Sequence, residues 1–368
     1  MTKTVRLLSP RAVVVVDEDE KPLGPGEVRI RTLFSGISTG TEMSLYRGTS
    51  PFLDKEWDPA TRLLSSGTIG QKRPTGQTAA RQAVLGLGPG KVHYPVDATG
   101  YEEVGRVVEV GEGVESVSVG QVVWGTWGHR GSVVRPAEYA SQRVLGGEAS
   151  PVIGVFSQIA AIALNVVLDA DIHVGETVAV FGVGVPGQIV AQLARLNGAR
   201  VVVVDGIGKR LELAKKLGAS EVIDFNQGGV AERIRDLTGG LGADVCLEVS
   251  GSYAALQEAI RSVAYSARVV AAGFFQGEGS RLALGEEFHH NRAQVVCSQI
   301  FGVAPALTYR WDQNRLQQTV MGLATSGQLE LEALVSHVLP VDSAPEAFRL
   351  LDESPEQALE VVLKFEEG

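Results

Sequence analysis

One stretch of the chain, residues 177–205, constrains the fold more than any other. It reads TVAVFGVGVPGQIVAQLARLNGARVVVVD. A β-branched run leads into the glycine-rich segment GVGVPG, which starts at Gly182; an apolar-periodic helix follows, and a second β run ends at Asp205. A strand, a glycine turn, a helix and a strand that ends in an acidic residue, in this order, predict a dinucleotide-binding βαβ unit.

Each glycine of this turn has its own predicted role. Gly182 permits the tight turn after the strand, Gly184 lets the backbone approach a pyrophosphate, and Gly187 lets the helix pack closely on the strand. The phosphates would lie at the N-terminus of the helix, where unpaired N–H groups favour an anion and where Val185 and Pro186 form the first turn. The hexapeptide alone can be a turn without a ligand. With both strands, the helix and the acidic residue in register, we favour a ligand.

The acidic residue that ends the second strand indicates which dinucleotide binds. Asp205 lies 23 residues after Gly182, close to the spacing of a carboxylate that accepts hydrogen bonds from a ribose diol. Because Asp205 would repel a 2′-phosphate, we expect NAD(H) rather than NADP(H). Lys209 and Arg210 follow closely and could bind a 2′-phosphate, which leaves NADP(H) as the alternative. FAD and S-adenosylmethionine also use related turns, and the mid-chain position of the motif disfavours both.

Composition limits the other function classes. A chain of 368 residues is long enough for two domains with separate cores. The net charge of −10 and the pI near 5.2 argue against a nucleic-acid partner. Cys246 and Cys297, the only cysteines, lie in β-like runs, so we expect two buried thiols and no disulfide framework. The sequence shows no signal peptide and no run of the ~20 apolar residues that a membrane span needs, so we expect a soluble, cytoplasmic protein without a membrane partner.

The pattern of elements divides the chain into three parts. Residues 1–157 are short β-rich segments between glycine and proline turns, which predicts a small barrel-like domain. Within this part, residues 45–96 are irregular, and we expect long loops that include a lid or an interface segment. Residues 158–301 alternate helix and strand patterns up to a sixth strand, QVVCSQI, which predicts a parallel doubly wound sheet. Residues 302–368 hold a long helix and final β segments that we expect to return to the first domain.

Several segments together resemble the medium-chain dehydrogenase/reductase superfamily. They are PGEVRIRTLFSGISTGTE, GYEEVGRVVEVGEGV, the dinucleotide motif, ARVVAAGF and the closing VDSAPEAFRLLDESPEQALEVVLKF. The resemblance extends over essentially the whole chain. It implies an α/β protein with a GroES-like β-barrel catalytic domain and a Rossmann domain with a doubly wound, parallel six-stranded sheet. It also implies that the last segment rejoins the barrel and that substrate binds in the cleft between the domains.

The chain departs from the metal-dependent members of that superfamily where they bind zinc. Where those enzymes have GICGTD, residues 36–42 read GISTGTE, with Ser38 or Thr39 in place of the cysteine. Where they have GHE, residues 100–102 read GYE, and Ser157 stands near the position of a third ligand. Two cysteines cannot supply a four-cysteine structural zinc lobe. We therefore expect no metal site, and the chain is similar to the zinc-free branch of bacteriochlorophyllide dehydrogenase-like alcohol dehydrogenases.

Without a metal, hydrogen-bond donors must stabilise the charge that develops on the substrate oxygen during hydride transfer. The resemblance places Tyr101 at the position of a histidine ligand, so its phenol could donate to that oxygen and relay the proton. Thr41 matches a hydroxyl that passes the alcohol proton outward in family members. Ser38, Thr39 and Glu102 complete the predicted catalytic group.

Other interpretations of these side chains remain open. Glu42 and Glu102 are expected to hold neighbouring side chains rather than to act as bases. Tyr101 could be a half-buried barrel tyrosine whose hydroxyl bonds a backbone carbonyl. His129 could line the substrate pocket, but we favour a surface histidine, and we expect the adjacent pair at residues 289–290 (HH) to be a loop feature rather than a metal site.

Analogy with the superfamily also places the nicotinamide end of the cofactor. In that family, backbone groups after the fifth and sixth strands of the sheet hold the carboxamide. They correspond here to Gly273 and Phe274, and to Ser298 and Gln299. Gly251, after the fourth strand, would lie against the adenosine side.

These features predict a zinc-independent, NAD-dependent dehydrogenase that transfers a hydride between the nicotinamide and a small-molecule secondary alcohol or ketone. A C=C (enoyl or quinone) reductase that uses NAD(P)H and a non-catalytic dinucleotide-binding sensor remain alternatives. The sixth strand would leave an apolar sheet edge, which natural proteins tend to pair or cover. We therefore expect a homodimer.

Overall fold

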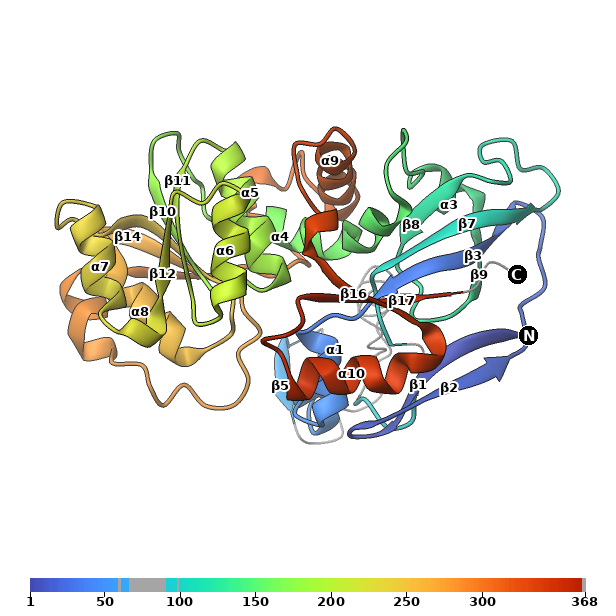
Figure 1. The fold of residues 1–368 in the computed structure, drawn as a ribbon, viewed down its shortest axis with the longest axis horizontal. Helices are drawn as coiled ribbons and strands as arrows, with labels where there is room; N and C mark the ends of the chain where they lie inside the picture. The colour runs from blue at the N-terminus through green and yellow to red at the C-terminus, as the bar shows by residue number, and fades with distance from the viewer. Residues whose placement is uncertain (59–60, 66–90, 98, 366–368) are drawn as a thin grey trace. The chain divides into compact units, whose positions relative to one another are not determined.

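The computed structural model describes residues 1–58, 61–65, 91–97 and 99–365 (Figure 1). Its contacts divide the chain into two compact units, which are described separately: unit 1 is Met1–Gln158 with Leu331–Gly368, and unit 2 is Ile159–Glu330. Residues 302–330, which the sequence pattern assigns to the return segment, group with unit 2. One reason is that the side chain of Gln192 bonds both the N–H and the carbonyl of Glu330.

Unit 2 is built around a parallel sheet with the strand order β12-β11-β10-β13-β14-β15. The strands are β10 Thr177–Phe181, β11 Arg200–Asp205, β12 Glu221–Asp224, β13 Ala243–Glu248, β14 Val263–Ala271 and β15 Gln294–Cys297. The order runs outward in both directions from β10, which is the doubly wound arrangement that creates a ligand site at the carboxyl ends of the strands. The predicted six-stranded Rossmann sheet is confirmed.

Helices cover both faces of this sheet. They are α4 Ser157–Asp169, α5 Val185–Leu196, α6 Gly208–Lys216, α7 Val230–Leu237, α8 Tyr253–Ser262 and α9 Gln313–Thr325. Figure 1 shows α5 and α6 on one side of the strands and α7 and α8 on the other. Ile234 of α7 and Ile260 of α8 pack in one cluster with Phe181 of β10. The central strands β10 and β11 are buried on both faces, which explains why their sequences are continuous valine-rich runs.

The two cysteines differ from the prediction in one respect. Cys246, in β13, is fully buried as expected, and burial raises the pKa of its thiol. Cys297 is exposed, so the prediction that it is buried was wrong. It ends β15, the last strand of the sheet, whose four residues are all exposed. An apolar run at a sheet edge therefore has the same sequence pattern as a buried strand.

Unit 1 is a mixed β structure with its helices at the margins. Its main sheet has the order β16-β17-β3-β7-β8, with β9 also paired to β3, and two smaller sheets have the orders β2-β1-β6 and β4-β5. The strands are β1 Thr2–Ser9, β2 Ala12–Glu18, β3 Glu27–Gly36, β4 Glu56–Asp58, β5 Leu63–Ser65, β6 Val96–Asp97, β7 Glu103–Val110, β8 Val122–Gly125, β9 Ser132–Pro136, β16 Val335–Pro340 and β17 Glu360–Lys364. The helices are α1 Thr41–Arg47, α3 Ala137–Ser141 and α10 Ala344–Glu353.

Short turns of helix link these elements. The 3₁₀ turns are Pro51–Leu53, Pro151–Phe156, Phe225–Gln227, Pro305–Leu307, Glu332–Leu334 and Val341–Ser343, and a π-helical turn covers Leu284–Phe288.

The end of the chain completes the sheet of unit 1. β17 pairs antiparallel with β3, with Val362 opposite Gly36, and parallel with β16. Phe348 of α10 and Leu363 of β17 share a buried cluster with Leu7 of β1. α10 and β17 thus belong to unit 1, and β17 brings Glu360 next to Gly36 at the end of β3.

The section predicted to be irregular, residues 45–96, falls only partly within the described chain. The described part contains the end of α1, the turn Pro51–Leu53 and the hairpin β4-β5. Residues 59–60 and 66–90 lie outside the described residues, as does the prediction of a lid or an interface segment there.

One described segment, Pro151–Asp169, is long and apolar enough by composition to cross a membrane, although the sequence analysis expects no such run. Most of it, 83%, is buried inside the structure. It resembles in this respect the core helix of a folded domain.

Candidate functional site

The glycine turn between β10 and α5 has the geometry that its three glycines predict. Gly182 has a φ of 85°, in the left-handed region that favours glycine. A Cβ on Gly187 would lie 1.9 Å from the carbonyl oxygen of Gly182, so only glycine allows the helix to approach the strand this closely. Gly184 is open, because the nearest atom to its ideal Cβ is Nη1 of Arg210 at 3.9 Å. The turn leaves room for a ligand at Gly184, with Val185 and Pro186 starting the helix.

Asp205 ends β11 beside this turn and is bonded to backbone N–H groups. Its Oδ2 accepts from Val183 at 2.8 Å, and its Oδ1 accepts from Gly206 at 2.8 Å and from Ile207 at 2.9 Å. The residue is 6% exposed. The carboxylate therefore joins the glycine turn to the loop after β11, in addition to any contact with a ribose. The sequence pattern indicates the contact with a ribose but not the link between the turn and the loop.

The loops after β13 and β14 meet at the carboxylate of Glu248, which no sequence motif indicates. Glu248, the last residue of β13, accepts from Ser250 N–H at 2.9 Å and from Gly251 N–H at 3.1 Å through its side chain. Its own carbonyl accepts from Gly273 N–H at 3.0 Å. Burial raises the pKa of Glu248, and the hydrogen bonds from Ser250 and Gly251 oppose that rise. Gly251 and Gly273 are thus held together at the carboxyl ends of their strands, and Phe274 beside them is partly exposed.

The residues after β15 are held by a side chain from α4. Asn165 Nδ2 donates to Ser298 Oγ at 3.4 Å and to the carbonyls of Gln299 at 3.4 Å and Gly302 at 3.1 Å. Ser298 N–H donates to the carbonyl of Ala271, at the end of β14, at 3.1 Å. Ser298 and Gln299 therefore lie at the same edge of the sheet as Gly273. A lone asparagine in an apolar helix gave the only sequence signal for this contact.

Three hydroxyls that we predicted as catalytic lie together in unit 1. The phenol of Tyr101 forms a hydrogen bond with Ser38 Oγ, and the Thr41 side chain lies close enough to lower the pKa of the phenol. Ser38 lies in the segment between β3 and α1, Thr41 starts α1, and Tyr101 lies in the segment that precedes β7. Ser38 and Tyr101 are each 4% exposed, whereas Thr41 is half-buried. Tyr101 is therefore not half-buried, and these partners are side-chain hydroxyls rather than a backbone carbonyl.

The environment keeps Tyr101 a neutral phenol. Burial raises its pKa far above the usual value, and the negative charges of Glu102 and Glu42 act in the same direction. The hydrogen bonds from Ser38 and Thr41 oppose this change. Such a group can donate a hydrogen bond to an oxygen that gains charge, but it is a poor base.

His129 is not a surface residue, so that interpretation was wrong. Its side chain is fully buried, with Nε2 at 2.5 Å from Glu42 Oε1 and Nδ1 at 2.5 Å from Ser35 Oγ. Burial alone would lower the pKa of His129, but Glu42 and the hydrogen bond to it raise the pKa above its usual value. Glu42 holds neighbouring side chains, as predicted. The order serine, histidine, glutamate resembles a hydrolase triad, but Ser35 is fully buried and no substrate can reach it.

Two further buried carboxyl groups lie beside Gly36. The ideal Cβ position of Gly36 is 2.7 Å from Glu360 Oε1 and 2.8 Å from Glu102 Oε2. Burial raises the pKa of Glu102 well above its usual value, as do the charges of Glu360 and Glu42. Burial and the charge of Glu42 raise the pKa of Glu360 in the same way. Burial and neighbouring negative charge therefore favour the protonated form of both groups.

Some predicted residues lie apart from these groups. Thr39 is exposed on the loop before α1. His289 and His290 are exposed and face each other edge to plane, with ring centroids 5.3 Å apart. Ser157, at the start of α4, is fully buried.

The described side chains do not fit the zinc ion of the metal-dependent dehydrogenases. Across residues 1–58, 61–65, 91–97 and 99–365, no group of three or more His, Cys, Asp or Glu residues could hold a metal ion. The positions of two expected ligands carry the hydroxyls of Ser38 and Tyr101, which bond each other. Zinc in proteins is held by thiolate, imidazole or carboxylate. The nearby imidazole of His129 and carboxylate of Glu42 are bonded to each other instead.

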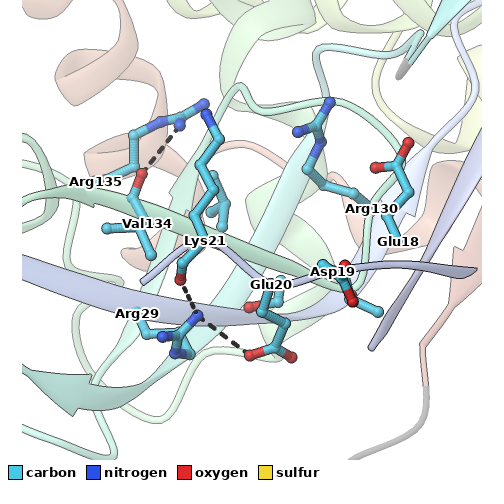
Figure 2. A pocket seen from close by; sticks show the side chains of 11 residues that line it. Glu18, Asp19, Glu20, Lys21, Arg29, Arg130, Val134 and Arg135 are labelled. Carbon is cyan, nitrogen blue, oxygen red and sulfur yellow. Dashed lines mark hydrogen bonds and ion pairs between the residues drawn. The ribbon is translucent and has the colours of Figure 1, made fainter. Parts of the chain in front are cut away.

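A separate pocket of about 90 Å³ lies on unit 1 (Figure 2). It is lined by charged side chains of both signs, and Figure 2 shows Arg29 bonded to Glu20 and to the carbonyl of Lys21. None of the predicted catalytic or cofactor-binding residues lines it. We assign it no ligand.

Comparison with known proteins gives relatives over nearly the whole chain. The family model described as "Zinc-binding dehydrogenase" matches residues 185–313. D-guloside 3-dehydrogenase of Escherichia coli (strain K12) is 31% identical over 97% of this chain and 98% of its own length. L-threonine 3-dehydrogenase of Pyrococcus furiosus is 27% identical over 92% of this chain and 91% of its own length. The solved structure of 2R,3R-butanediol dehydrogenase from Bacillus subtilis shares the fold, with a TM-score of 0.74 at 22% identity and 99% coverage of both chains.

Proposed function

The chain belongs to the zinc-binding dehydrogenase family of the medium-chain dehydrogenase/reductase superfamily, and from this premise we propose that it is a zinc-independent, NAD(H)-dependent dehydrogenase of secondary alcohols. Its relatives are oxidoreductases that act on alcohols, and the chain carries the dinucleotide-binding turn of such enzymes. The proposal has three finer parts: the absence of a catalytic metal, the choice of NAD(H) and the class of alcohol.

The hydroxyl group of Ser38, Thr41 and Tyr101 carries this proposal. By the resemblance, Ser38 and Tyr101 correspond to positions of zinc ligands in metal-dependent members, and Thr41 corresponds to a hydroxyl that passes the alcohol proton outward. A hydrogen bond joins Ser38 and Tyr101, and Thr41 lies close to the phenol. Bound NAD(H) would supply the hydride to the carbonyl carbon in reduction, and the substrate oxygen would take up a proton as the C=O π bond breaks. Tyr101 donates a hydrogen bond to that oxygen as its charge develops and passes the proton. Oxidation of the alcohol runs through the same steps in reverse.

The half-buried Thr41 gives the proton an exit. Because Tyr101 is a poor base, it cannot hold an extra proton taken from an alcohol. It can accept that proton only if it releases its own proton at the same time. Thr41 lies close enough to Tyr101 to lower the pKa of the phenol, and it is the half-buried member of the group. We assign Tyr101 as the donor to the substrate oxygen, Ser38 as its fixed partner and Thr41 as the outward relay. Glu102 raises the pKa of Tyr101 and so keeps its proton in place.

The cofactor assignment rests on the carboxylate of Asp205. It is held by three backbone N–H groups at the edge of the glycine turn, where it would repel a 2′-phosphate. Arg210 lies near Gly184, where it can neutralise the pyrophosphate. Gly273, Phe274, Ser298 and Gln299, at the carboxyl edge of the sheet, would hold the carboxamide, and Gly251 would border the adenosine.

Similarity over nearly full length to a D-guloside 3-dehydrogenase supports a polyhydroxylated substrate. The further relative named for threonine also acts at position 3 of its substrate, by its name. We therefore propose a sugar or sugar-like secondary alcohol as the substrate class.

A coupled binding and turnover experiment tests this function. Purified protein is mixed with NAD⁺ or NADP⁺ and with a panel of glycosides, polyols, threonine and 2,3-butanediol, and absorbance of the reduced cofactor is followed. The expected result is reduction of NAD⁺ by at least one secondary alcohol. Turnover of enones or quinones alone would indicate a C=C reductase, and cofactor binding without turnover of any compound would indicate a sensor.

We also propose that the protein is a homodimer joined at β15. Val295 and Val296 of this edge strand are 42% and 36% exposed, which leaves an apolar edge with unpaired backbone groups. Sedimentation should give twice the 39.0 kDa mass of the chain. A mass that stays at that of one chain at micromolar concentration would contradict the dimer.

A further inference from the structure

We propose that His129 is a positioning residue that, as an imidazolium, holds both arms of the Ser38–Tyr101 pair. The inference rests on the proposed function, in which that pair acts on the substrate oxygen. His129 lies far from both residues in sequence, and its role is visible only from the contacts of its ring and of its backbone.

The first arm is the segment that carries Ser38. His129 Nε2 lies 2.5 Å from Glu42 Oε1, and the other oxygen of that carboxylate, Oε2, accepts from Ser38 N–H at 3.1 Å. Glu42 is 2% exposed, and His129 and Glu42 pair inside the unit rather than with solvent. The imidazole therefore fixes the carboxylate, and the carboxylate fixes the backbone of Ser38.

The second arm is the segment that carries Tyr101. His129 N–H donates to the carbonyl of Thr99 at 2.8 Å. The ring also lies against Gly100, because a Cβ on Gly100 would be 2.7 Å from Cε1 and 2.8 Å from Nδ1. Gly100 has a φ of 101°, so both its conformation and the ring require glycine there. The residue just before Tyr101 is thus set in place by the same imidazole that fixes Glu42.

The hydrogen-bond pattern assigns the protons of the ring. With Glu103 as an ionised acceptor, Ser35 Oγ donates its only proton to Glu103 Oε1 at 3.3 Å and accepts from His129 Nδ1 at 2.5 Å. Glu103 Oε2 in turn accepts from Trp127 N–H at 2.6 Å, which fixes that carboxylate. On the other side of the ring, the carboxylate of Glu42 accepts from Nε2. Both ring nitrogens are then donors, which makes the ring an imidazolium. It contacts the carboxylate of Glu42 directly and that of Glu103 through Ser35.

This arrangement explains how a group of neutral hydroxyls keeps its geometry without a metal. In a metal site, the ion orders its ligands by direct bonds. Here an ion pair, with His129 0% and Glu42 2% exposed, orders the segments that carry the hydroxyls. Because loss of one partner leaves a buried charge unpaired, breaking the ion pair between His129 and Glu42 is strongly destabilising.

A double-mutant cycle separates positioning from simple support of the fold. His129→Gln should lower kcat about 10- to 100-fold, in line with the cost of misplacing a reacting group by about 1 Å, and leave the Kd for NAD⁺ unchanged. In the Tyr101→Phe background the same substitution should change kcat by less than about 3-fold, because the positioned donor is already gone. His93→Gln, at an exposed histidine of unit 1, is the matched control and should change neither value.

A second readout does not depend on turnover. Hydrogen exchange of the Ser38 amide should accelerate at least ~10-fold in His129→Gln and stay unchanged in His93→Gln. Nitrogen-15 spectra of the wild type at pH 7.5 should show both ring nitrogens of His129 protonated. If His129→Gln does not fold, Glu42→Gln, which keeps the shape of the side chain and removes its charge, replaces it in both tests.

The outcomes distinguish the two proposals. Unchanged exchange at Ser38, or an equal loss of kcat in both backgrounds, would overturn the positioning role of His129. A single protonated ring nitrogen would overturn its assignment as an imidazolium. Accelerated exchange in a protein that oxidises no alcohol would sustain the positioning role and contradict the proposed function.

Discussion

At the residue scale, the proposed chemistry depends on whether the surroundings of Tyr101 keep its phenol protonated. Burial and the charges of Glu102 and Glu42 raise the pKa of the phenol, and only Ser38 and Thr41 favour its ionised form. The phenol therefore stays protonated at neutral pH, and in the proposed mechanism it serves as a donor. Its value to catalysis is greatest in the transition state, when the substrate oxygen carries the most charge.

Removal of this donor is the most direct test at a single residue. Tyr101→Phe keeps the ring packing and deletes only the hydroxyl, so we expect kcat to fall about 10²- to 10⁴-fold, the range for general acid–base assistance. The Kd for NAD⁺ and the melting temperature should change little. Steady-state kinetics and a thermal unfolding scan check both points, and wild-type turnover in the variant would make Tyr101 a structural residue.

A second prediction at this scale concerns Asp205. Asp205→Ala should weaken NAD(H) binding by roughly 1.5–3 kcal/mol, the range for hydrogen bonds to a charged group. NADP(H) binding should stay level or improve, because the negative charge that would oppose a 2′-phosphate is gone. Calorimetric titration with both cofactors measures the two affinities. Tighter binding of NADP(H) than of NAD(H) by the unmodified protein would refute the assignment.

Single residues also show where prediction from sequence stops. The hydroxyl positions Ser38, Thr41 and Tyr101 could be predicted, because each stands in a local motif. The role of His129 could not, since its partners Glu42 and Ser35 lie 87 and 94 residues away in sequence. An isolated histidine in a glycine-rich segment has no local pattern that separates a buried ion pair from an exposed side chain.

At the scale of elements, three strands bring buried carboxyl groups together. Glu360 starts β17, Glu102 directly precedes β7, and both approach Gly36 at the end of β3. Burial and neighbouring negative charge raise the pKa of Glu360 well above its usual value. Glu102 and Glu42 are the titratable groups that act on it or share this environment.

This arrangement predicts a pH dependence of stability with a definite sign. Because the folded-state pKa of Glu360 is raised, the folded protein binds the proton more tightly, and stability falls as pH rises from the unfolded-state pKa toward the folded-state value. Glu360→Gln lacks this titration. It should be more stable than the wild type at pH 8, by about 1.4 kcal/mol for each pKa unit of the shift, and the difference should vanish near pH 4.

Denaturant titration at several pH values measures this difference. Glu346→Gln, at an exposed glutamate of α10, is the matched control. A Glu360→Gln variant that is equally or less stable at pH 8 would show that the carboxylate is ionised and bound in the folded state.

Elements also show which features of the fold the sequence indicates. The strands of unit 2 could be predicted because parallel strands buried on both faces require continuous apolar runs, as in residues 201–204. The exposure of Cys297 could not, because Val295 and Val296 give β15 the same apolar pattern at the sheet edge. Which strand is last in a sheet depends on all the others.

At the scale of the whole molecule, the order of the two units along the chain can be predicted from the sequence, but the boundary between them cannot. The division falls after Glu330, whereas the change of pattern in the sequence falls near residue 302. The contacts that decide it, between Gln192 and Glu330, join residues 138 apart. The barrel-like part and the doubly wound sheet could be predicted because one shows short β segments and the other alternates helices and strands. The boundary could not, because residues distant in sequence form the contacts there.

The central claim is that this dehydrogenase works with hydroxyl donors in place of a zinc ion. The measurement that tests it most directly is NAD⁺ reduction by an alcohol substrate after prolonged chelation, with elemental analysis of the same sample. The account predicts an unchanged rate and melting temperature with less than stoichiometric zinc, because the described side chains offer no set of ligands for the ion. Loss of activity on chelation, recovered when zinc is restored, would contradict it.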